Sequence, residues 1–203
     1  MKKITVYRII LVILVITSII LATLVIRKNV ENRKIENNTQ AVLQEIKKGN
    51  KTTTNEIDVI QEIDEEIGGY KVIGIINIPK INIEYPIIEI GDIDPESAKK
   101  PMKLSIIKYW GENVNDYGNL SIAGHNNKDG TMFGKTKKLE IGDIVELTDL
   151  KGQTIQYSIY DIFVTDPNDV SILLPKDELV REVTLITCTN GNKQRLILKA
   201  KEI

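Results

Sequence analysis

The chain contains very little cysteine and histidine: its 203 residues include one of each, Cys188 and His125. A single cysteine excludes an intramolecular disulfide, and one Cys with one His cannot complete the nitrogen and sulfur ligands of a structural zinc site. Acidic and basic residues nearly cancel, to a net charge of -1, so no overall field favours nucleic acid. No P-loop or dinucleotide-binding motif occurs either. The composition therefore predicts no nucleic-acid partner and no metal site built on these two side chains.

Long apolar runs are absent except near the N-terminus. From Ile4 to Ile26 almost every residue is apolar, which is long enough for a bilayer-spanning helix of ~20 residues. A cleaved signal peptide is the alternative, because Met1–Lys3 resembles its charged n-region. The run is too long for a typical signal peptide, however, and no small-x-small cleavage site precedes Arg27. We therefore expect an uncleaved membrane anchor in residues 1–28, whose orientation is left open by positive residues on both sides.

The next segment, residues 29–69, is rich in Asn, Glu, Lys and Thr and has thinly spaced apolar residues. We expect a solvated stalk, because such a segment offers no packable apolar face. The pattern allows a helix around Thr39–Lys48, and the stretch Gly49–Asn55 ends any continuous helix. Gly68 and Gly69 mark the boundary to the next domain.

From Tyr70 onward, short runs rich in Ile and Val alternate with turn residues. Many short strands with few helices predict an all-β domain, residues 70–203, that forms a closed barrel or a sandwich. Helical signal is limited to Pro95–Lys100 and Asp169–Leu174. The predicted strands are Lys71–Ile78, Ile81–Ile90, Asn119–Ala123, Asp143–Leu147, Thr154–Thr165, Glu182–Cys188 and Gln194–Lys201.

The lone cysteine closes one of these strands. The alternating run that ends at Cys188, the Asn190-Gly191 turn and the alternating run that follows predict a β-hairpin. With this turn, Cys188 lies opposite Lys193, and Arg195 shares its face one diagonal step away. We therefore expect the thiol and the guanidinium to point outward together, beside apolar surface. The opposite face is suited to a core and carries Val183, Leu185, Leu196, Leu198 and Ala200.

The sequence also contains the groups that cysteine catalysis requires. The thiolate is the reactive form of cysteine, and a nearby positive charge or base favours it. Arg195 offers the charge, and His125, at the end of a predicted strand, offers proton transfer. Taken singly, each has a plainer interpretation: a lone Cys is often a small buried hydrophobe, a lone His is often structural, and a strand Arg is often solvated. Together, Cys188, His125 and Arg195 favour a catalytic site.

These residues resemble those of a known family. The run Thr184-Leu-Ile-Thr-Cys188, with Arg195 on the next strand, and the run Ala123-Gly-His-Asn126 resemble sortases, the bacterial surface transpeptidases that join proteins to the cell wall or to one another. The resemblance covers the chain from about Tyr70 to its end and favours the closed barrel over the sandwich. Further similar segments are Val72–Pro79, Ile83–Pro86, Met132-Phe133 and Ile141–Asp143.

The resemblance implies a cysteine transpeptidase that needs no cofactor. Cys188 would attack the carbonyl of a threonine in an LPxTG-like C-terminal sorting signal of a secreted protein, forming an acyl-enzyme. His125 would act as acid toward the leaving amine and as base toward the incoming amine of a peptidoglycan cross-bridge or a lysine. Arg195 would hydrogen-bond the substrate backbone and stabilise the oxyanion. Ala123 and Ile186 match family positions that line the peptide groove.

Location and subclass are further implications of the resemblance. The N-terminal tail would stay in the cytoplasm and the catalytic domain would lie outside the cell, anchored by one membrane span. The segment His125–Phe133 is similar to class B sortases, whereas the stretch between Thr165 and Glu182 is too short for the inserted helix of that class. Pilus-building members usually add a lid and a second hydrophobic tail, whereas this chain stops at Ile203 in strand-like sequence. A class A or class D style enzyme therefore fits best.

The sequence gives little support for a calcium-binding site. Some sortases bind calcium through loop carboxylates, and the candidates here are Asp92, Asp94, Glu96 and Asp143. Their spacing fits no calcium-loop signature, and such residues are usually solvated turn positions. We therefore expect no bound metal.

Two other functions remain open. A hydrolytic cysteine peptidase would use the same acyl-enzyme chemistry with water as the acceptor. A non-catalytic, membrane-tethered barrel would bind extended peptides with the same face, although a binding module does not require Cys, His and Arg together. The products formed with and without an added amine would separate these functions.

Overall fold

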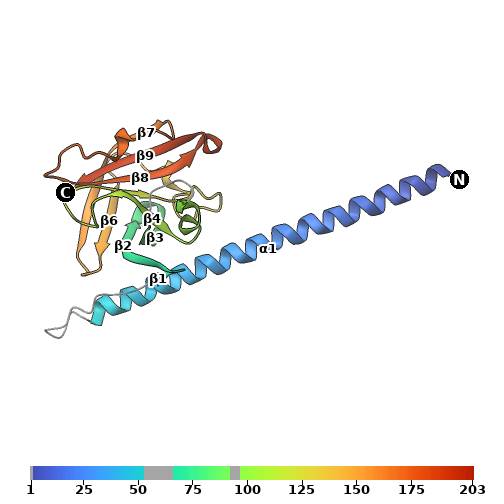
Figure 1. Cartoon of the computed structure of the whole chain (residues 1–203), viewed down its shortest axis with the longest axis horizontal. Coiled ribbons are helices and arrows are strands. Elements are labelled where there is room, and N and C mark those ends of the chain that lie inside the picture. The colour runs from blue at the N-terminus through green and yellow to red at the C-terminus, as the bar shows by residue number, and fades with distance from the viewer. Residues whose placement is uncertain (1, 53–65, 92–96) are drawn as a thin grey trace. The chain divides into compact units, whose positions relative to one another are not determined.

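A computed structural model describes residues 2–52, 66–91 and 97–203. By its internal contacts the chain divides into two compact units, Met1–Asn38 and Thr39–Ile203. Helix α1 (Lys2–Thr52) is one helix of 51 residues, and every other described element lies in the second unit (Figure 1). The first unit is therefore helical, and the second contains the β-structure.

The first half of α1 is apolar and unpacked. Large side chains such as Leu14 and Ile26 are 62% and 60% exposed. In the described chain one helical stretch, Tyr7–Lys48, is long and apolar enough to cross a membrane; its most apolar 18-residue window has a mean hydropathy of 3.3 and no buried residue. Apolar surface of this kind is stable in lipid rather than in water. This stretch is a candidate membrane span and contains most of the apolar run that predicted one.

The second half of α1 differs from the solvated stalk that we expected. Leu43 and Ile46 are 0% and 2% exposed and belong to an apolar cluster of the second unit. Thr39 is also buried, and its hydroxyl donates a hydrogen bond to the main-chain oxygen of Leu104 at 2.7 Å. Side chains three positions apart share one helix face, so two thinly spaced apolar residues are enough to form a contact. Helix α1 is described as far as Thr52 and includes the first part of the stretch Gly49–Asn55 that we expected to end it; the rest of that stretch lies outside the described residues.

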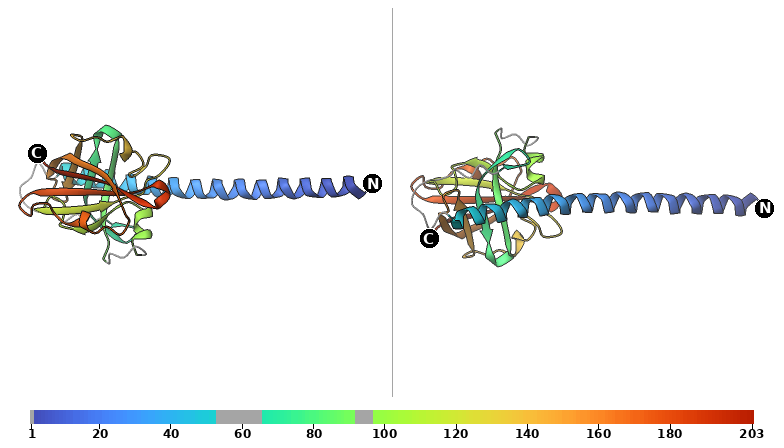
Figure 2. Two further views of the ribbon diagram at one scale, coloured as in Figure 1. Left: turned by 90° about the horizontal axis from the view of Figure 1, so that it is seen from above. Right: turned by 90° about the horizontal axis from the view of Figure 1, so that it is seen from below.

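The predicted all-β domain is a closed barrel. In the part of the chain that the structure describes, eight strands, β2 to β9, close into a ring because β2 pairs with both β3 and β6. The order around the barrel is β2-β3-β4-β5-β8-β9-β7-β6, and the short β1 pairs with β2 outside this ring. Figure 2 shows the barrel from two further sides, with the paired strands β8 and β9 in red. The strands are β1 (Glu66–Ile67), β2 (Tyr70–Ile78), β3 (Ile83–Glu89), β4 (Ile106–Gly111), β5 (Gly118–Ala123), β6 (Ile144–Asp149), β7 (Thr154–Thr165), β8 (Arg181–Thr189) and β9 (Gln194–Glu202).

One long strand, β4, was not predicted. A register shift lies between Lys108 and Trp110 where β4 pairs with β5, and a bulge of this kind breaks the two-residue alternation that identifies a strand in sequence. The two helical stretches predicted after Tyr70, Pro95–Lys100 and Asp169–Leu174, contain only short 3-10 helices among the described residues. Pro95 and Glu96 lie outside the described residues. The 3-10 helices are η1 (Pro79–Ile81), η2 (Ser97–Lys99), η3 (Pro101–Lys103), η4 (Thr136–Lys138), η5 (Ser171–Leu173) and η6 (Asn190–Asn192).

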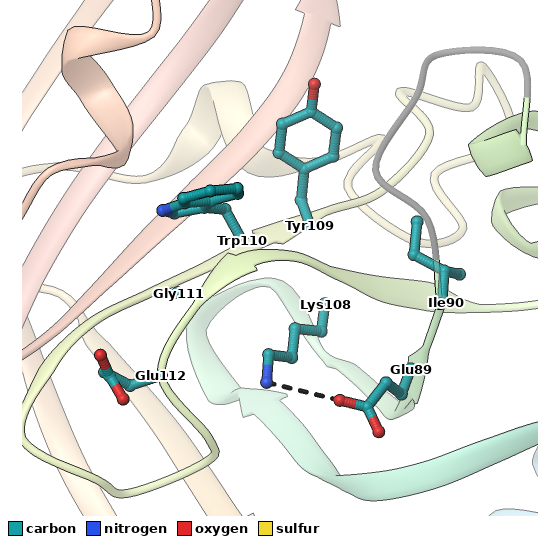
Figure 3. Close-up of a pocket in the computed structure, with 8 residues that line it drawn as sticks. Glu89, Ile90, Lys108, Tyr109, Trp110, Gly111 and Glu112 are labelled. Atoms are coloured by element: carbon teal, nitrogen blue, oxygen red, sulfur yellow. Dashed lines mark hydrogen bonds and ion pairs between the residues drawn. The ribbon is translucent and has the colours of Figure 1, made fainter.

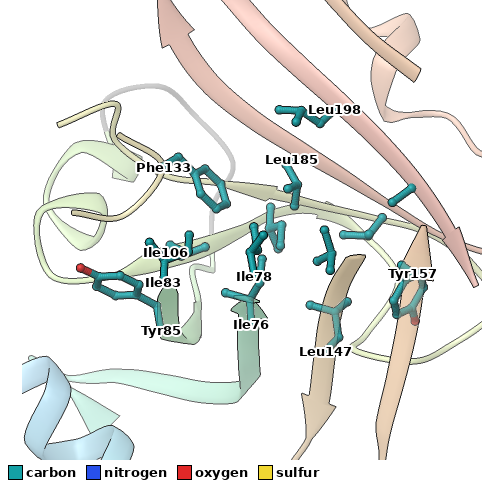
Figure 4. Close-up of a cluster of buried hydrophobic side chains, with 14 of the residues drawn as sticks. Ile76, Ile78, Ile83, Tyr85, Ile106, Phe133, Leu147, Tyr157, Leu185 and Leu198 are labelled. Atoms are coloured by element: carbon teal, nitrogen blue, oxygen red, sulfur yellow. The ribbon is translucent and has the colours of Figure 1, made fainter. Parts of the chain in front are cut away.

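Two apolar clusters lie on opposite faces of the strands. The first fills the barrel interior and contains Leu185 of β8 and Leu198 of β9, both fully buried (Figure 4). The second contains the alternate residues Ile186 and Ile197 of the same strands. The face assignment predicted for the hairpin is therefore confirmed. Labelled members of the interior cluster in Figure 4 include Ile76, Ile78, Ile106, Phe133, Leu147 and Tyr157.

Candidate active site

Cys188 and Arg195 are direct neighbours across the β8–β9 hairpin. The thiol is free and half-buried, and the Arg195 side chain is also half-buried. Nη1 of Arg195 donates hydrogen bonds to the main-chain oxygens of Asn192 and Gln194, at 3.2 and 3.3 Å. These bonds hold the guanidinium at the hairpin loop, and a guanidinium carries five N–H donors. The hairpin therefore combines a thiol with a fixed positive charge on one face.

The predicted pairing of Cys188 with Lys193 is wrong. Lys193 lies in the loop, because Thr189 and Gln194 form the last pair of the hairpin. The three residues Asn190–Asn192 have φ of 48°, 66° and 71°, a left-handed conformation that Asn and Gly tolerate best. A third such residue lengthens the loop beyond the two-residue Asn-Gly turn. The shift keeps Cys188 on its predicted face and moves Arg195 from a diagonal to a direct position.

The parallel pairing of β5 with β8 brings His125 to the same end of the barrel. Ala123, the last residue of β5, pairs with Ile186 of β8. One residue further, the amide of Gly124 donates to the carbonyl of Ile186 at 3.2 Å. His125 therefore begins the loop beyond the end of β5, next to the end of β8 that carries Cys188.

The environment of His125 favours the neutral imidazole. Burial lowers the pKa of this half-buried histidine below its usual 6.5, and the positive charge of Lys103 lowers it further. At neutral pH an imidazole of this kind is ready to accept a proton, as a general base must be.

An apolar cluster lies on the Cys188 face of β8. Ala123 and Ile186 are 5% and 7% exposed and belong to the second cluster together with Ile197. Val170 and Leu174, which flank η5, are 70% and 63% exposed, while residues of η5 between them pack on the cluster. An extended peptide with apolar side chains is the type of ligand that such a surface fits.

An open pocket of about 440 Å³ lies elsewhere, at the ends of β3 and β4 (Figure 3). Tyr109 and Trp110 project from β4 on one side, and Lys108 forms an ion pair with Glu89 at 3.4 Å. Cys188, His125 and Arg195 do not line this pocket. Its lining residues are Glu89, Ile90, Gly91, Lys108, Tyr109, Trp110, Gly111 and Glu112.

Comparison with known proteins assigns the family. A model of the sortase domain matches residues 76–203, more than half of the chain. The chain belongs to the sortase family. Sortase D of Bacillus subtilis (strain 168) is 33% identical to it over 141 residues, which cover 69% of this chain and 65% of that protein. The chain spans 63% to 65% of the length of the curated sortases that it matches. These are sortases A and D, and the subclass of this sortase stays a prediction.

Solved sortase structures have the same fold. A Clostridium perfringens sortase D5 transpeptidase superposes with a TM-score of 0.61 and 30% identity, covering 84% of this chain and 99% of that chain. Sortase C of Clostridium perfringens, solved with the C-terminal cell wall sorting motif, gives a TM-score of 0.56 at 24% identity. That comparison covers 84% of this chain and 94% of that one. The barrel is therefore a sortase barrel.

Two residues at the candidate site were missed by sequence reasoning. Lys103 is near enough to His125 to lower its pKa, and Asn126 donates its side-chain amide to the main-chain oxygen of Cys188 at 2.7 Å. Asn126 directly follows His125, so its position was a usable signal. Lys103 gave no such signal, because folding alone brings it near His125.

The candidate calcium ligands divide into two groups. Asp92, Asp94 and Glu96 lie outside the described residues. Asp143 forms an ion pair with Lys80 at 2.9 Å and accepts a hydrogen bond from a backbone amide at 2.7 Å. Within residues 2–52, 66–91 and 97–203, no group of three or more His, Cys, Asp or Glu side chains is arranged to hold a metal ion. The contacts of Asp143 are those of a structural turn residue.

Proposed function

We propose that this protein is a membrane-anchored transpeptidase that joins secreted proteins to an amine acceptor through an acyl-enzyme at Cys188. The observation that carries the proposal is the direct pairing of Cys188 with Arg195, beside the strand end that leads to His125. Membership of the sortase family supports it. A single cysteine and a single histidine at one end of a barrel have no structural need to lie together.

The chemistry begins with the thiol. His125, neutral at pH 7 because burial lowers its pKa, accepts the thiol proton, and the sulfur of Cys188 attacks the carbonyl carbon of the substrate threonine. The peptide C–N bond then breaks, and His125 gives the proton to the leaving amine. An incoming amine attacks the thioester and loses a proton to His125, the C–S bond breaks, and His125 returns the proton to the sulfur of Cys188. The Arg195 guanidinium stabilises the oxyanion in both steps.

The substrate is an LPxTG-like sorting signal. The exposed apolar side chains of Val170 and Leu174, beside the cluster that contains Ala123 and Ile186, support this choice, since they suit the apolar residues that precede the threonine. The sortase C structure with a cell wall sorting motif is consistent with the same class of ligand. The acceptor is an amine of the peptidoglycan or of another protein.

Helix α1 is the proposed membrane anchor. We propose a single span with the short N-terminal tail in the cytoplasm and the barrel, from residue 70 onward, outside the cell, where secreted proteins and the cell wall are accessible. The exposed apolar half of α1 supports the span. Protease added to intact cells should degrade the barrel, and a barrel protected until the cells are opened would contradict this orientation.

A transfer assay tests the activity. The full chain in detergent micelles is incubated with a panel of LPxTG-like peptides, with and without an amine acceptor, beside Cys188→Ala. We expect cleavage that depends on Cys188 and ligation of the amine. Cleavage without ligation would instead indicate a hydrolytic peptidase, and binding without cleavage would indicate a peptide-binding module.

A further inference from the structure

The side chain of Asn126 continues the β5–β8 ladder after its backbone bonds end. The amide of Gly124 donates to the carbonyl of Ile186 at 3.2 Å. Two positions further along both segments, the side-chain Nδ2 of Asn126 donates to the carbonyl of Cys188 at 2.7 Å. A parallel ladder repeats every two residues, so the carboxamide supplies the bond that a backbone amide would make next.

The loop geometry explains why a side chain is needed. After Gly124 the backbone leaves the barrel sheet: Asn126 forms an isolated bridge with Met132, and the carbonyl of His125 accepts a hydrogen bond from the amide of Phe133 at 3.0 Å. The main chain at this point is therefore engaged within its own loop. A carboxamide at Asn126 has the donor and the reach to connect that loop back to β8.

A second side chain makes the same type of connection. Thr187 is 2% exposed, and its hydroxyl donates to the carbonyl of Gly124 at 2.8 Å. Thr187 lies one residue before Cys188, and Asn126 lies one residue after His125. Each side chain thus donates a hydrogen bond to the main chain of the other segment.

We infer that Asn126 is a positioning residue, which holds the backbone of Cys188 against the loop that carries His125. The inference rests on the proposed acyl transfer at Cys188. A nucleophile and its base act efficiently only in a narrow range of distance and orientation. Loss of this bond should therefore slow the chemical steps more than it weakens peptide binding.

Three variants of the full chain in detergent test the role of the donor. Asn126→Ala removes the carboxamide, and Asn126→Asp keeps its shape but replaces the donor with an acceptor that repels the Cys188 carbonyl. Asn127→Ala is the matched control, because the Asn127 side chain donates its hydrogen bond to Thr131 within the same loop at 2.9 Å. We expect kcat to fall about 3- to 10-fold for Asn126→Ala, in line with one hydrogen bond, and further for Asn126→Asp. KM should stay within about 2-fold, and Asn127→Ala should match the wild type.

Alkylation of Cys188 by iodoacetamide over a range of pH provides a readout that does not depend on transfer. Asn126→Asp should move the midpoint of this profile upward, because a carboxylate beside the main chain of Cys188 disfavours the thiolate, whereas Asn127→Ala should leave it unchanged. Wild-type kcat and wild-type alkylation in Asn126→Ala and Asn126→Asp would overturn the inference. If the wild type alkylates but transfers nothing, the proposed function fails while the alkylation profiles still test whether Asn126 positions Cys188. Asn126→Gln, which keeps the donor, should recover part of the activity lost in Asn126→Ala.

Discussion

On the β8–β9 hairpin, the inward face carries Leu185 and Leu198, and the outward face carries Cys188 and Arg195. Both leucines are fully buried, whereas the thiol and the guanidinium are half-buried. The two faces share one backbone, because successive side chains of a strand point in opposite directions. The outward face also contributes to packing, because Ile186 and Ile197 belong to the second apolar cluster. Substitutions of Cys188 and Arg195 should lower activity with little loss of stability, and substitutions of Leu185 and Leu198 should do the reverse.

The largest expected effect is that of Cys188→Ala. Transfer should fall by at least about 10⁴-fold, since the proposed nucleophile is lost. The melting temperature should stay close to that of the wild type, because the thiol faces away from the interior cluster. A peptide ligation assay and a thermal melt check the two halves of this expectation. Global unfolding of the variant would break the comparison between the faces.

Arg195→Lys should reduce transfer by about 10²-fold or more, as loss of an oxyanion donor does in other enzymes. A lysine keeps the charge but not the planar fork of donors. Lys193→Ala is the control: Lys193 is exposed and lies in the hairpin loop, so its loss should change the kcat/KM of transfer by less than about 2-fold. A larger loss of transfer activity for Lys193→Ala than for Arg195→Lys would instead favour the predicted pairing of Cys188 with Lys193.

On the inward face, Leu198→Ala should lower the free energy of unfolding by about 2–5 kcal/mol, the usual range for a buried leucine. The kcat/KM of the folded fraction should stay near that of the wild type, since none of the proposed catalytic groups lies on this face. Lys201→Ala, at an exposed position of the same strand, should be nearly neutral. Chemical denaturation measures both, and an unchanged unfolding midpoint in Leu198→Ala would contradict the assignment of the core.

The smallest expected effect is electrostatic and concerns His125. Burial and the charge of Lys103 lower its pKa, so NMR titration of the only histidine should give a midpoint below 6.5. Because the unfolded chain then binds more protons, stability should fall as the pH drops from 7 through 6.5 toward the folded pKa. Lys103→Gln should raise the midpoint slightly while burial keeps it below 6.5, and Lys128→Gln should not change it. A wild-type midpoint at or above 6.5 would exclude this environment.

Much of the fold could be read from local sequence. The strand that ends at Cys188 and its partner strand were predicted with the correct faces, because alternation of apolar residues is a local signal. Strand β4 was missed, because its bulge interrupts that alternation. Leu43 and Ile46 were assigned to a solvated stalk, because two apolar residues form no visible pattern until a partner surface exists.

The sequence by itself determined the chemical inventory of this sortase: one thiol, one imidazole, an apolar N-terminal run and a β-rich domain with defined faces. Tertiary structure alone decided the direct pairing of Cys188 with Arg195, the contact of Asn126 with Cys188 and the influence of Lys103 on His125. The physical reason is the distance along the chain over which each signal acts. Side-chain alternation and apolar periodicity act between neighbours in the chain, whereas loop conformation and closure of the barrel bring together residues that no local pattern connects.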